Sequence, residues 1–243
     1  MYTVYVDDLL IHSQHSPSQE HHLVNPTLKL AENSAGSFEF TIPYGHPGYN
    51  EIQRMTSTIA VERENQCIWT GRVISESEDF MRNRKYTCEG ALAFLNDTYQ
   101  PHINYQNTTV QRLFRQIILR HNEKKKFEPD RQFTIGTVNV EALGEDFEFE
   151  YETDYEKTWD VLKNMFIDRL DGHLSITYNG NDRTPIINYK QEYEDVSVQS
   201  INFGENLMDF TKNWDLSNLF TVIIPKGQIR VEVGETGSTG TTS

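Results

Sequence analysis

The sequence lacks the features that mark membrane and exported proteins. It contains only two cysteines, Cys67 and Cys88, in 243 residues. No apolar run approaches the ~20 residues needed to cross a bilayer, and the N-terminus has no basic, apolar and small-residue signal pattern. We therefore expect a soluble chain made in the cytoplasm, with both cysteines as reduced core thiols. A disulfide between them is the less favoured alternative.

The sequence also lacks the short motifs of common enzyme classes. It has no G-x-S-x-G nucleophile turn, no H-E-x-x-H zinc motif, no phosphate-binding loop and no dinucleotide fingerprint. We expect no catalytic residue, no metal ligand and no cofactor-binding residue, and hence no cofactor. Cys88 lies inside a predicted strand, which favours packing over a nucleophilic role.

Positive charge is scarce relative to negative charge. The chain has 22 Lys and Arg against 36 Asp and Glu, a formal net charge of −14. Nonspecific duplex binding requires Lys and Arg side chains that neutralise the phosphates. The excess of acidic residues therefore disfavours nucleic acid as a bound partner. Lys124, Lys125 and Lys126 lie near a predicted helix end, where they complement the helix dipole.

Two polar clusters invite a metal or acid–base interpretation. His12, His15, His21 and His22 lie in the segment HSQHSPSQEHH, whose spacing matches no standard metal site. We expect a solvated loop there. Three glutamates in residues 146–152 alternate with aromatics on a predicted strand, without a companion histidine. We expect a solvated strand face.

Alternating apolar and polar residues predict a β-rich domain over residues 1–98. Residues 1–11 predict a hairpin with a two-aspartate turn, residues 23–43 two further strands, and residues 57–64 another. Aromatic residues make up 12% of the chain, and much of this content alternates with polar residues, as is typical of strands.

The stretch around which this domain is organised combines two strands and a short helix. Residues 67–74 predict a strand, residues 75–84 a charged and solvated connection, and residues 85–89 the return strand. A glycine then breaks the strand, and a short helix follows. We interpret Glu89 and Asp97, which flank the glycine and this helix, as structural caps.

An α+β domain with two helices and a small sheet is predicted over residues 99–195. The first helix has apolar residues at spacings of three and four, with Asn107 or Thr108 as its N-cap. The second follows a T-x-x-E capping box formed by Thr153 and Glu156. A hairpin with an Asn-Gly turn comes next.

Several motifs resemble one protein family. They are W-T-G-R-V and Y-T-C-E-G-A-L-A-F-L-N-D within residues 69–97, S-F-E-F-T-I-P at 37–43, and I-x-F-G-x-N-L followed by S-x-L-x-T-x-x-x-P-x-G within 201–227. This order is similar to the N-terminal region of phage and prophage minor tail proteins, the tail-associated lysin or prophage endopeptidase tail family. That family is related to the baseplate hubs of phage tails.

The resemblance implies an α+β, β-rich and baseplate-hub-like fold. In this fold a split β-barrel tube-type domain at 1–98 contains an inserted α+β domain at 99–195. Residues 196–233 would supply return strands toward a second tube domain, and residues 234–243 a flexible tail. Family members also carry a loop and a short helix in the segment that corresponds to residues 44–52.

The resemblance further implies a structural role in the tail tip or baseplate hub of a siphophage. The chain would form a homotrimeric ring that closes or continues the tail tube and attaches host-recognition or lysin parts. Its implied partners are further copies of itself, the distal tail protein, tail tube and tape-measure proteins, and receptor-binding or fibre proteins. DNA would pass through the channel without specific binding. The expected location is the distal end of the tail in the virion, after synthesis in the host cytoplasm.

Two alternatives stay open. One is a tail-associated peptidase or cell-wall hydrolase. The other is a host carbohydrate-binding module, with Tyr44, Tyr49, Tyr99 and Tyr105 as sugar-stacking residues. Family members usually continue through more tube-domain strands, whereas this sequence ends soon after its return strand. We therefore expect that any hydrolase activity lies in a C-terminal region absent from this sequence, and that this chain is not an enzyme.

Overall fold

The computed structural model of the chain describes residues 1–14, 21–140, 148–180, 182–192, 200 and 202. The described residues from 1 to 192 belong to one compact unit. The predicted return strands of 196–233 and the tail of 234–243 lie outside the described residues, apart from two isolated positions. The predicted domain limits therefore stay predictions.

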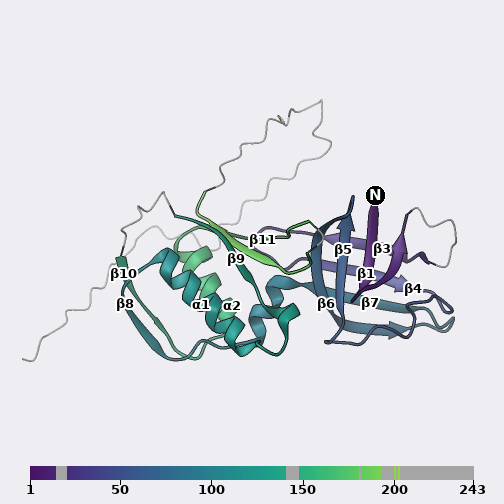
Figure 1. Cartoon of the computed structure of the whole chain (residues 1–243), viewed down its shortest axis with the longest axis horizontal. Coiled ribbons are helices and arrows are strands. Elements are labelled where there is room, and N and C mark those ends of the chain that lie inside the picture. The colour runs from purple at the N-terminus through teal and green to yellow at the C-terminus, as the bar shows by residue number, and fades with distance from the viewer. Residues whose placement is uncertain (15–20, 141–147, 181, 193–199, 201, 203–243) are drawn as a thin grey trace, which may run out of the picture. The chain divides into compact units, whose positions relative to one another are not determined.

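Seven described strands form one antiparallel sheet that curls into a half-barrel (Figure 1). Its order is β2-β1-β5-β6-β7-β4-β3, which leaves β2 and β3 at the two edges. The strands are β1 (Tyr2–Val6), β2 (Leu9–Ser13), β3 (Val24–Lys29), β4 (Ser37–Ile42), β5 (Thr58–Arg63), β6 (Gln66–Glu78) and β7 (Arg84–Gly90). The prediction of a β-rich fold is confirmed.

The sheet packs around a hydrophobic cluster made by alternate residues of neighbouring strands, since alternate side chains of a strand share a face. Trp69 is central to it, and its indole N–H donates to the carbonyl of Ala35 at 3.3 Å. A Cβ at Gly90 would lie 1.9 Å from that carbonyl oxygen and 2.6 Å from the indole nitrogen, so only glycine fits there. Fully buried members include Ile11, Ile42, Ile59, Val73, Tyr86 and Cys88.

Strand β6 is longer than the sequence pattern indicates. The predicted connection began at residue 75, but β6 continues to Glu78 and pairs with β7 through Glu78↔Arg84. Charged side chains mark exposure and not the end of a strand, because the backbone can still pair. The described residues 44–52 form turns and not the short helix implied by the resemblance. Two glycines and Pro47 in that segment disfavour a helix.

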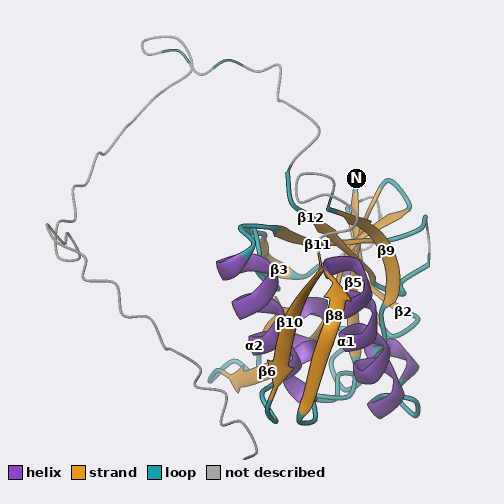
Figure 2. Cartoon of the chain, turned by 90° about the vertical axis from the view of Figure 1, so that its left-hand side faces the viewer, coloured by secondary structure: helices purple, strands orange, loops and turns teal. Residues whose placement is uncertain are grey.

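The helices lie beside two smaller sets of strands. β10 pairs antiparallel with β8, and β12 pairs with β11 antiparallel and with β9 in parallel. Figure 2 shows the β8–β10 ribbon in front of the helices. The elements are η2 (Ala91–Asp97), β8 (Ile103–Thr109), α1 (Val110–Lys124), η3 (Pro129–Arg131), β9 (Thr134–Asn139), β10 (Glu148–Thr153), α2 (Thr158–Leu162), the π-helix η5 (Lys163–Arg169), β11 (His173–Thr177) and β12 (Ile186–Lys190).

A second hydrophobic cluster joins η2, the helices and the three-stranded sheet. The apolar face of α1 is buried in it, as the spacing of its apolar residues predicts. Among its fully buried members are Phe94, Leu95, Leu113, Phe114, Ile117, Phe166 and Tyr189. No helix of the described residues is long and apolar enough to span a membrane.

Both helix starts differ from prediction. The N-cap of α1 is Thr109, one residue after Thr108, and its hydroxyl accepts a hydrogen bond from the backbone of Arg112 at 3.2 Å. The predicted capping box is wrong, because Thr153 belongs to β10 and its hydroxyl donates to the carbonyl of Pro101 at 2.6 Å. Pairing of β10 with β8 removes Thr153 from the helix, and α2 begins at Thr158.

Candidate functional site

The two cysteines act as packing residues. Both are free and buried, and Cys88 lies opposite Val73 in the ladder between β6 and β7. Burial raises the pKa of the Cys67 thiol to about 12 and also raises the pKa of Cys88. A thiol held protonated in this way is a poor nucleophile.

The histidine segment is only partly the solvated loop that we expected. His12 is 8% exposed and lies in β2, where its Nδ1 accepts a hydrogen bond from the backbone of Leu23 at 3.2 Å. Its ring centre is 5.7 Å from that of His22. Burial, followed by the charges of His22 and His46, lowers the pKa of His12. His15 lies outside the described residues. Over the described ranges, no group of three or more His, Cys, Asp or Glu is placed to hold a metal ion.

The four tyrosines weighed as sugar-stacking residues do not offer four open faces. Tyr44 and Tyr99 are half exposed, whereas Tyr49 and Tyr105 are buried. The Arg84 guanidinium lies 4.0 Å from the centre of the Tyr49 ring. The rings of Tyr49 and Tyr105 are therefore covered by the chain itself.

The acidic residues divide into solvated and paired groups. Glu150 and Glu152 of β10 are exposed, as predicted for a solvated strand face. The interpretation of Glu89 and Asp97 as caps is wrong, since both bind the guanidinium of Arg72. They belong to a partly buried ionic cluster that the sequence alone did not reveal.

Arg72 is held from two directions. Its Nε and one terminal nitrogen donate to Glu89 Oε1 at 2.8 and 2.7 Å. Its terminal nitrogens also donate to both carboxylate oxygens of Asp97, one of them at 2.9 Å. Burial would raise the pKa of Asp97, but the hydrogen bonds and charge of Arg72, with the charge of Lys125, outweigh it and lower that pKa.

Arg131 ties the helical cluster to the turn that precedes β5. It is 4% exposed and donates to the backbone carbonyls of Met55 and Thr56 at 3.3 and 3.1 Å. Its guanidinium lies 4.5 Å from the centre of the Phe94 ring, and that of Arg72 lies 5.5 Å from the same ring. Two buried arginines thus meet at one aromatic ring of η2.

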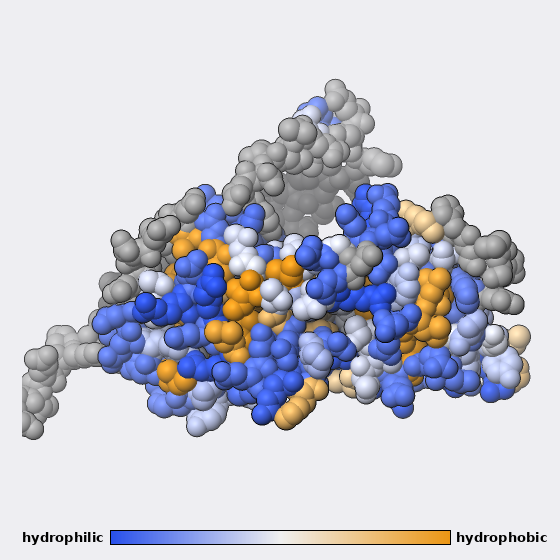
Figure 3. All heavy atoms as spheres, in the orientation of Figure 1, coloured by the Kyte–Doolittle hydropathy of each residue, from blue (hydrophilic) through white to orange (hydrophobic). Residues whose placement is uncertain are grey.

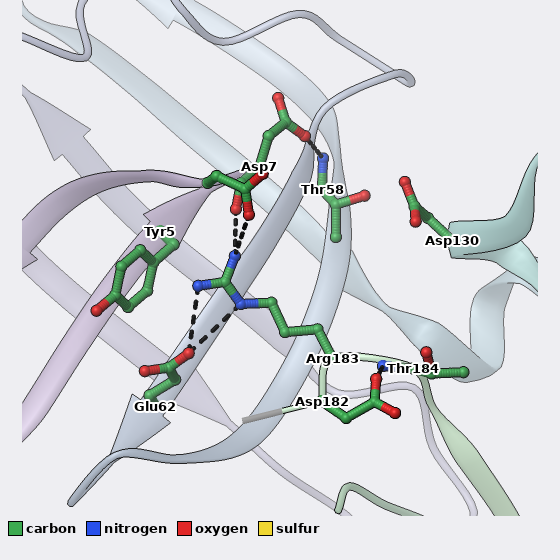
Figure 4. A pocket seen from close by; sticks show the side chains of 9 residues that line it. Tyr5, Asp7, Thr58, Glu62, Asp130, Asp182, Arg183 and Thr184 are labelled. Carbon is green, nitrogen blue, oxygen red and sulfur yellow. Dashed lines mark hydrogen bonds and ion pairs between the residues drawn. The ribbon is translucent and has the colours of Figure 1, made fainter. Parts of the chain in front are cut away.

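A pocket of about 580 Å³ lies where the connection between β11 and β12 reaches the seven-stranded sheet. Figure 4 shows Arg183 extending from this connection toward Glu62 and the backbone of Asp7. One guanidinium nitrogen lies 3.3 Å from Glu62 Oε1, and the guanidinium carbon lies 4.3 Å from the centre of the Tyr5 ring. Arg183 therefore fixes this connection to β1 and β5.

The same pocket is strongly acidic. Its lining carries one arginine and five carboxylates, which are Asp7, Asp8, Glu62, Asp130 and Asp182. Asp7 is also held by a hydrogen bond from the backbone of Thr58 at 2.8 Å. Figure 3 shows that the face in view is mainly hydrophilic, with hydrophobic patches over the helices and over the strands. The excess of carboxylates in the pocket that Arg183 lines repels phosphate groups.

The residues that carry these contacts were only partly visible in the sequence. Arg72 lies within the W-T-G-R-V motif, but its partners are 17 and 25 residues later in the chain. Arg183 follows the predicted Asn-Gly turn, and its partner Glu62 is 121 residues earlier. Neither pairing has a local sequence signal.

No protein-family profile matches the chain, and no curated protein sequence matches it. Similar solved structures do exist. A 43 kDa tail protein of prophage MuSo2 from Shewanella oneidensis aligns at 13% identity and a TM-score of 0.49, covering 78% of this chain and 52% of that protein. A tail protein from Neisseria meningitidis aligns at 16% identity and a TM-score of 0.46, covering 76% and 49%.

A prophage tail protein from Listeria monocytogenes aligns at 15% identity and a TM-score of 0.38, covering 66% of this chain and 43% of that protein. The chain thus spans about half the length of the solved tail proteins that it matches. At these identities and TM-scores the likeness assigns no activity, partner or position in an assembly. The similar structures are phage and prophage tail proteins, the same class of protein that the sequence motifs indicate.

Proposed function

We propose that this chain is a structural component of a phage tail tip or baseplate hub. In this proposal three copies form a ring that closes or continues the tail tube. The half-barrel sheet serves as a split-barrel tube-type domain, and the helical part is inserted into it. The ring attaches distal host-recognition or lysin parts, and the chain itself has no hydrolase activity.

One observation carries the proposal: the residues of the family motif interlock as a structural unit. Trp69 and Gly90 pack together at the carbonyl of Ala35, while Arg72 binds Glu89 and Asp97. The motif residues therefore build the contact between two hydrophobic clusters.

The charge of the chain supports the proposed path of DNA. An acidic channel wall would repel phosphates and let the genome pass without adhering, and the net charge of −14 fits such a wall. A ring would also cover the two edge strands of the sheet, β2 and β3, which otherwise attract unwanted pairing. The proposed neighbours are the distal tail protein, tube and tape-measure proteins, and fibre proteins.

Electron microscopy of the purified chain tests this proposal. We expect class averages that show a threefold ring with a central channel. Particles that contain one copy, or rings of another symmetry, would contradict it. Binding of a glycan by such single copies would support the carbohydrate-binding alternative instead.

A further inference from the structure

The hairpin of β6 and β7 ends in two apolar side chains that project into solvent. Phe80 is 99% exposed and Met81 is 71% exposed. Both lie in a stretch that is otherwise polar and charged. An exposed Phe forgoes the free energy of burial, and adjoining exposed apolar side chains are candidates for an interaction site.

The turn that carries this pair has a fixed backbone. Asp79 accepts hydrogen bonds from the backbone and the side-chain amide of Asn83, at 2.8 and 2.9 Å. The backbone N–H of Arg82 donates to the carbonyl of Asp79 at 3.0 Å. A preorganised turn loses little conformational entropy when it docks.

Two tyrosines support the hairpin from one side. The hydroxyl of Tyr49 donates to the carbonyl of Arg82 at 2.7 Å. The guanidinium of Arg82 lies 4.2 Å from the centre of the Tyr44 ring, and that of Arg84 lies 4.0 Å from the centre of the Tyr49 ring. The arginines are thus engaged at the base of the hairpin, and Phe80 is left as the outermost apolar group.

An apolar groove of about 600 Å³ lies near the other end of β6. Leu30 and Tyr2, two of its lining residues, are 64% and 41% exposed. Arg63 brings a positive charge to the same lining. The apolar lining residues in the described part include Tyr2, Pro26, Leu28, Leu30, Phe38 and Ile68.

Phe80 and Met81 form the tip of the hairpin. This tip and the groove lie at opposite ends of strand β6. Ile68 lines the groove and Phe80 follows the last residue of β6 by two positions. At ~3.3 Å per residue, about 40 Å of strand separates them, so the tip cannot reach the groove of its own chain. A second copy can supply the missing partner. Head-to-tail contacts of this kind close into a ring when the rotation between copies allows it.

We propose that Phe80 and Met81 of one copy insert into the groove between β1 and β3 of the next copy. This inference rests on the proposed ring and identifies the contact that joins its subunits. The apolar pair matches the apolar lining of the groove, and the acidic Asp79 beside the pair matches the positive charge of Arg63. Each copy donates one tip and receives another.

Site-specific cross-linking tests this contact. Two differently tagged variants, Phe80→Cys and Leu30→Cys, are mixed and oxidised, and the disulfide-linked product is sized and identified by its tags. The native Cys67 and Cys88 are 6% and 0% exposed and do not compete. The matched control is Phe127→Cys, which replaces another strongly exposed Phe, 86% exposed, outside the hairpin.

We expect a product that carries both tags when Phe80→Cys is mixed with Leu30→Cys, and none when Phe127→Cys replaces Phe80→Cys. We also expect Phe80→Ser to weaken self-association at least tenfold and Phe127→Ser to leave it unchanged. Equal yields from the two mixtures, or products that join only two Phe80→Cys copies, would overturn the contact.

Light scattering on the unmodified chain distinguishes an error in the proposed contact from an error in the proposed ring. If the chain is trimeric but the tip does not cross-link to the groove, this contact is wrong and the proposed ring stands. If the chain is monomeric at every concentration, the ring itself is wrong and the contact fails with it.

Discussion

At the scale of single residues, Arg72 connects the two hydrophobic clusters. It lies on β6, while its partner Asp97 ends η2 and its aromatic neighbour Phe94 belongs to the helical cluster. A buried guanidinium without a partner is very unfavourable, because its charge loses water and gains nothing in return. The ion pair of Arg72 with Asp97 therefore favours the arrangement in which η2 lies against β6.

Asp97→Asn removes one of the two carboxylates that hold Arg72. We expect it to lower the free energy of unfolding by about 3 kcal/mol, since it leaves a buried charge only partly compensated. Urea denaturation at neutral pH measures the change. The control is Glu39→Gln, which breaks the exposed ion pair with Lys85 and should leave the unfolding curve unchanged. Equal small effects of the two substitutions would show that Arg72 does not depend on Asp97.

At the scale of elements, strand β8 passes directly into helix α1. β8 ends at Thr109, and α1 begins at Val110 with Thr109 as its N-cap. Two buried threonines, Thr98 and Thr158, then join the helix to its surroundings. The Thr98 hydroxyl lies 2.7 Å from both His121 Nδ1 and the Thr158 hydroxyl. These contacts fix the position of α1 relative to η2 and α2.

Thr109→Ala removes the side-chain acceptor at the start of α1. We expect a loss of about 1 kcal/mol of stability, measured by chemical denaturation followed through helical circular dichroism. Thr109→Ser keeps a hydroxyl at this position and should retain most of that stability. The assignment of the cap fails if serine and alanine destabilise the protein equally.

The sequence predicted most strands, because alternation of apolar residues reports directly on burial. It failed where tertiary contacts decide the outcome. Thr153 and Glu156 have a local capping pattern, but pairing of Thr153 with Ile103 on β8 takes priority. His12 lies in a polar stretch but is buried beside His22 and Leu23. The pairing of Arg183 with Glu62 joins distant segments, so no local pattern predicts it.

At the scale of the whole molecule, three buried histidines make stability depend on pH. Burial is the main cause that lowers the pKa of His12, His46 and His121. His46 Nε2 donates to the carbonyl of Ile11, and its Nδ1 accepts from the backbone of Gly48 at 2.9 Å. A proton on that Nδ1 would oppose the N–H that it accepts, so the neutral ring is the folded form.

These histidines bind protons more readily in the unfolded chain, whose imidazole pKa is about 6.5. Their contribution to stability is therefore fully present above that pH and is lost as the pH falls below it. We expect the urea midpoint to be the same at pH 8.0 and 7.5 and lower at pH 5.5. His46→Gln should reduce this drop.

The control for the pH effect is Phe127→Ser, since Phe127 is strongly exposed and carries no titratable group. It should leave the drop between pH 7.5 and 5.5 unchanged. A drop of the same size in the unmodified chain and in His46→Gln would show that His46 does not contribute.

The oligomeric state of the purified chain is the most direct test of the proposed trimeric ring. The measurement is its absolute mass in solution, by light scattering over a range of concentrations. We predict three times the mass of one chain, approached as concentration rises and lost in Phe80→Ser. The mass of a single chain at every concentration would contradict the proposed ring.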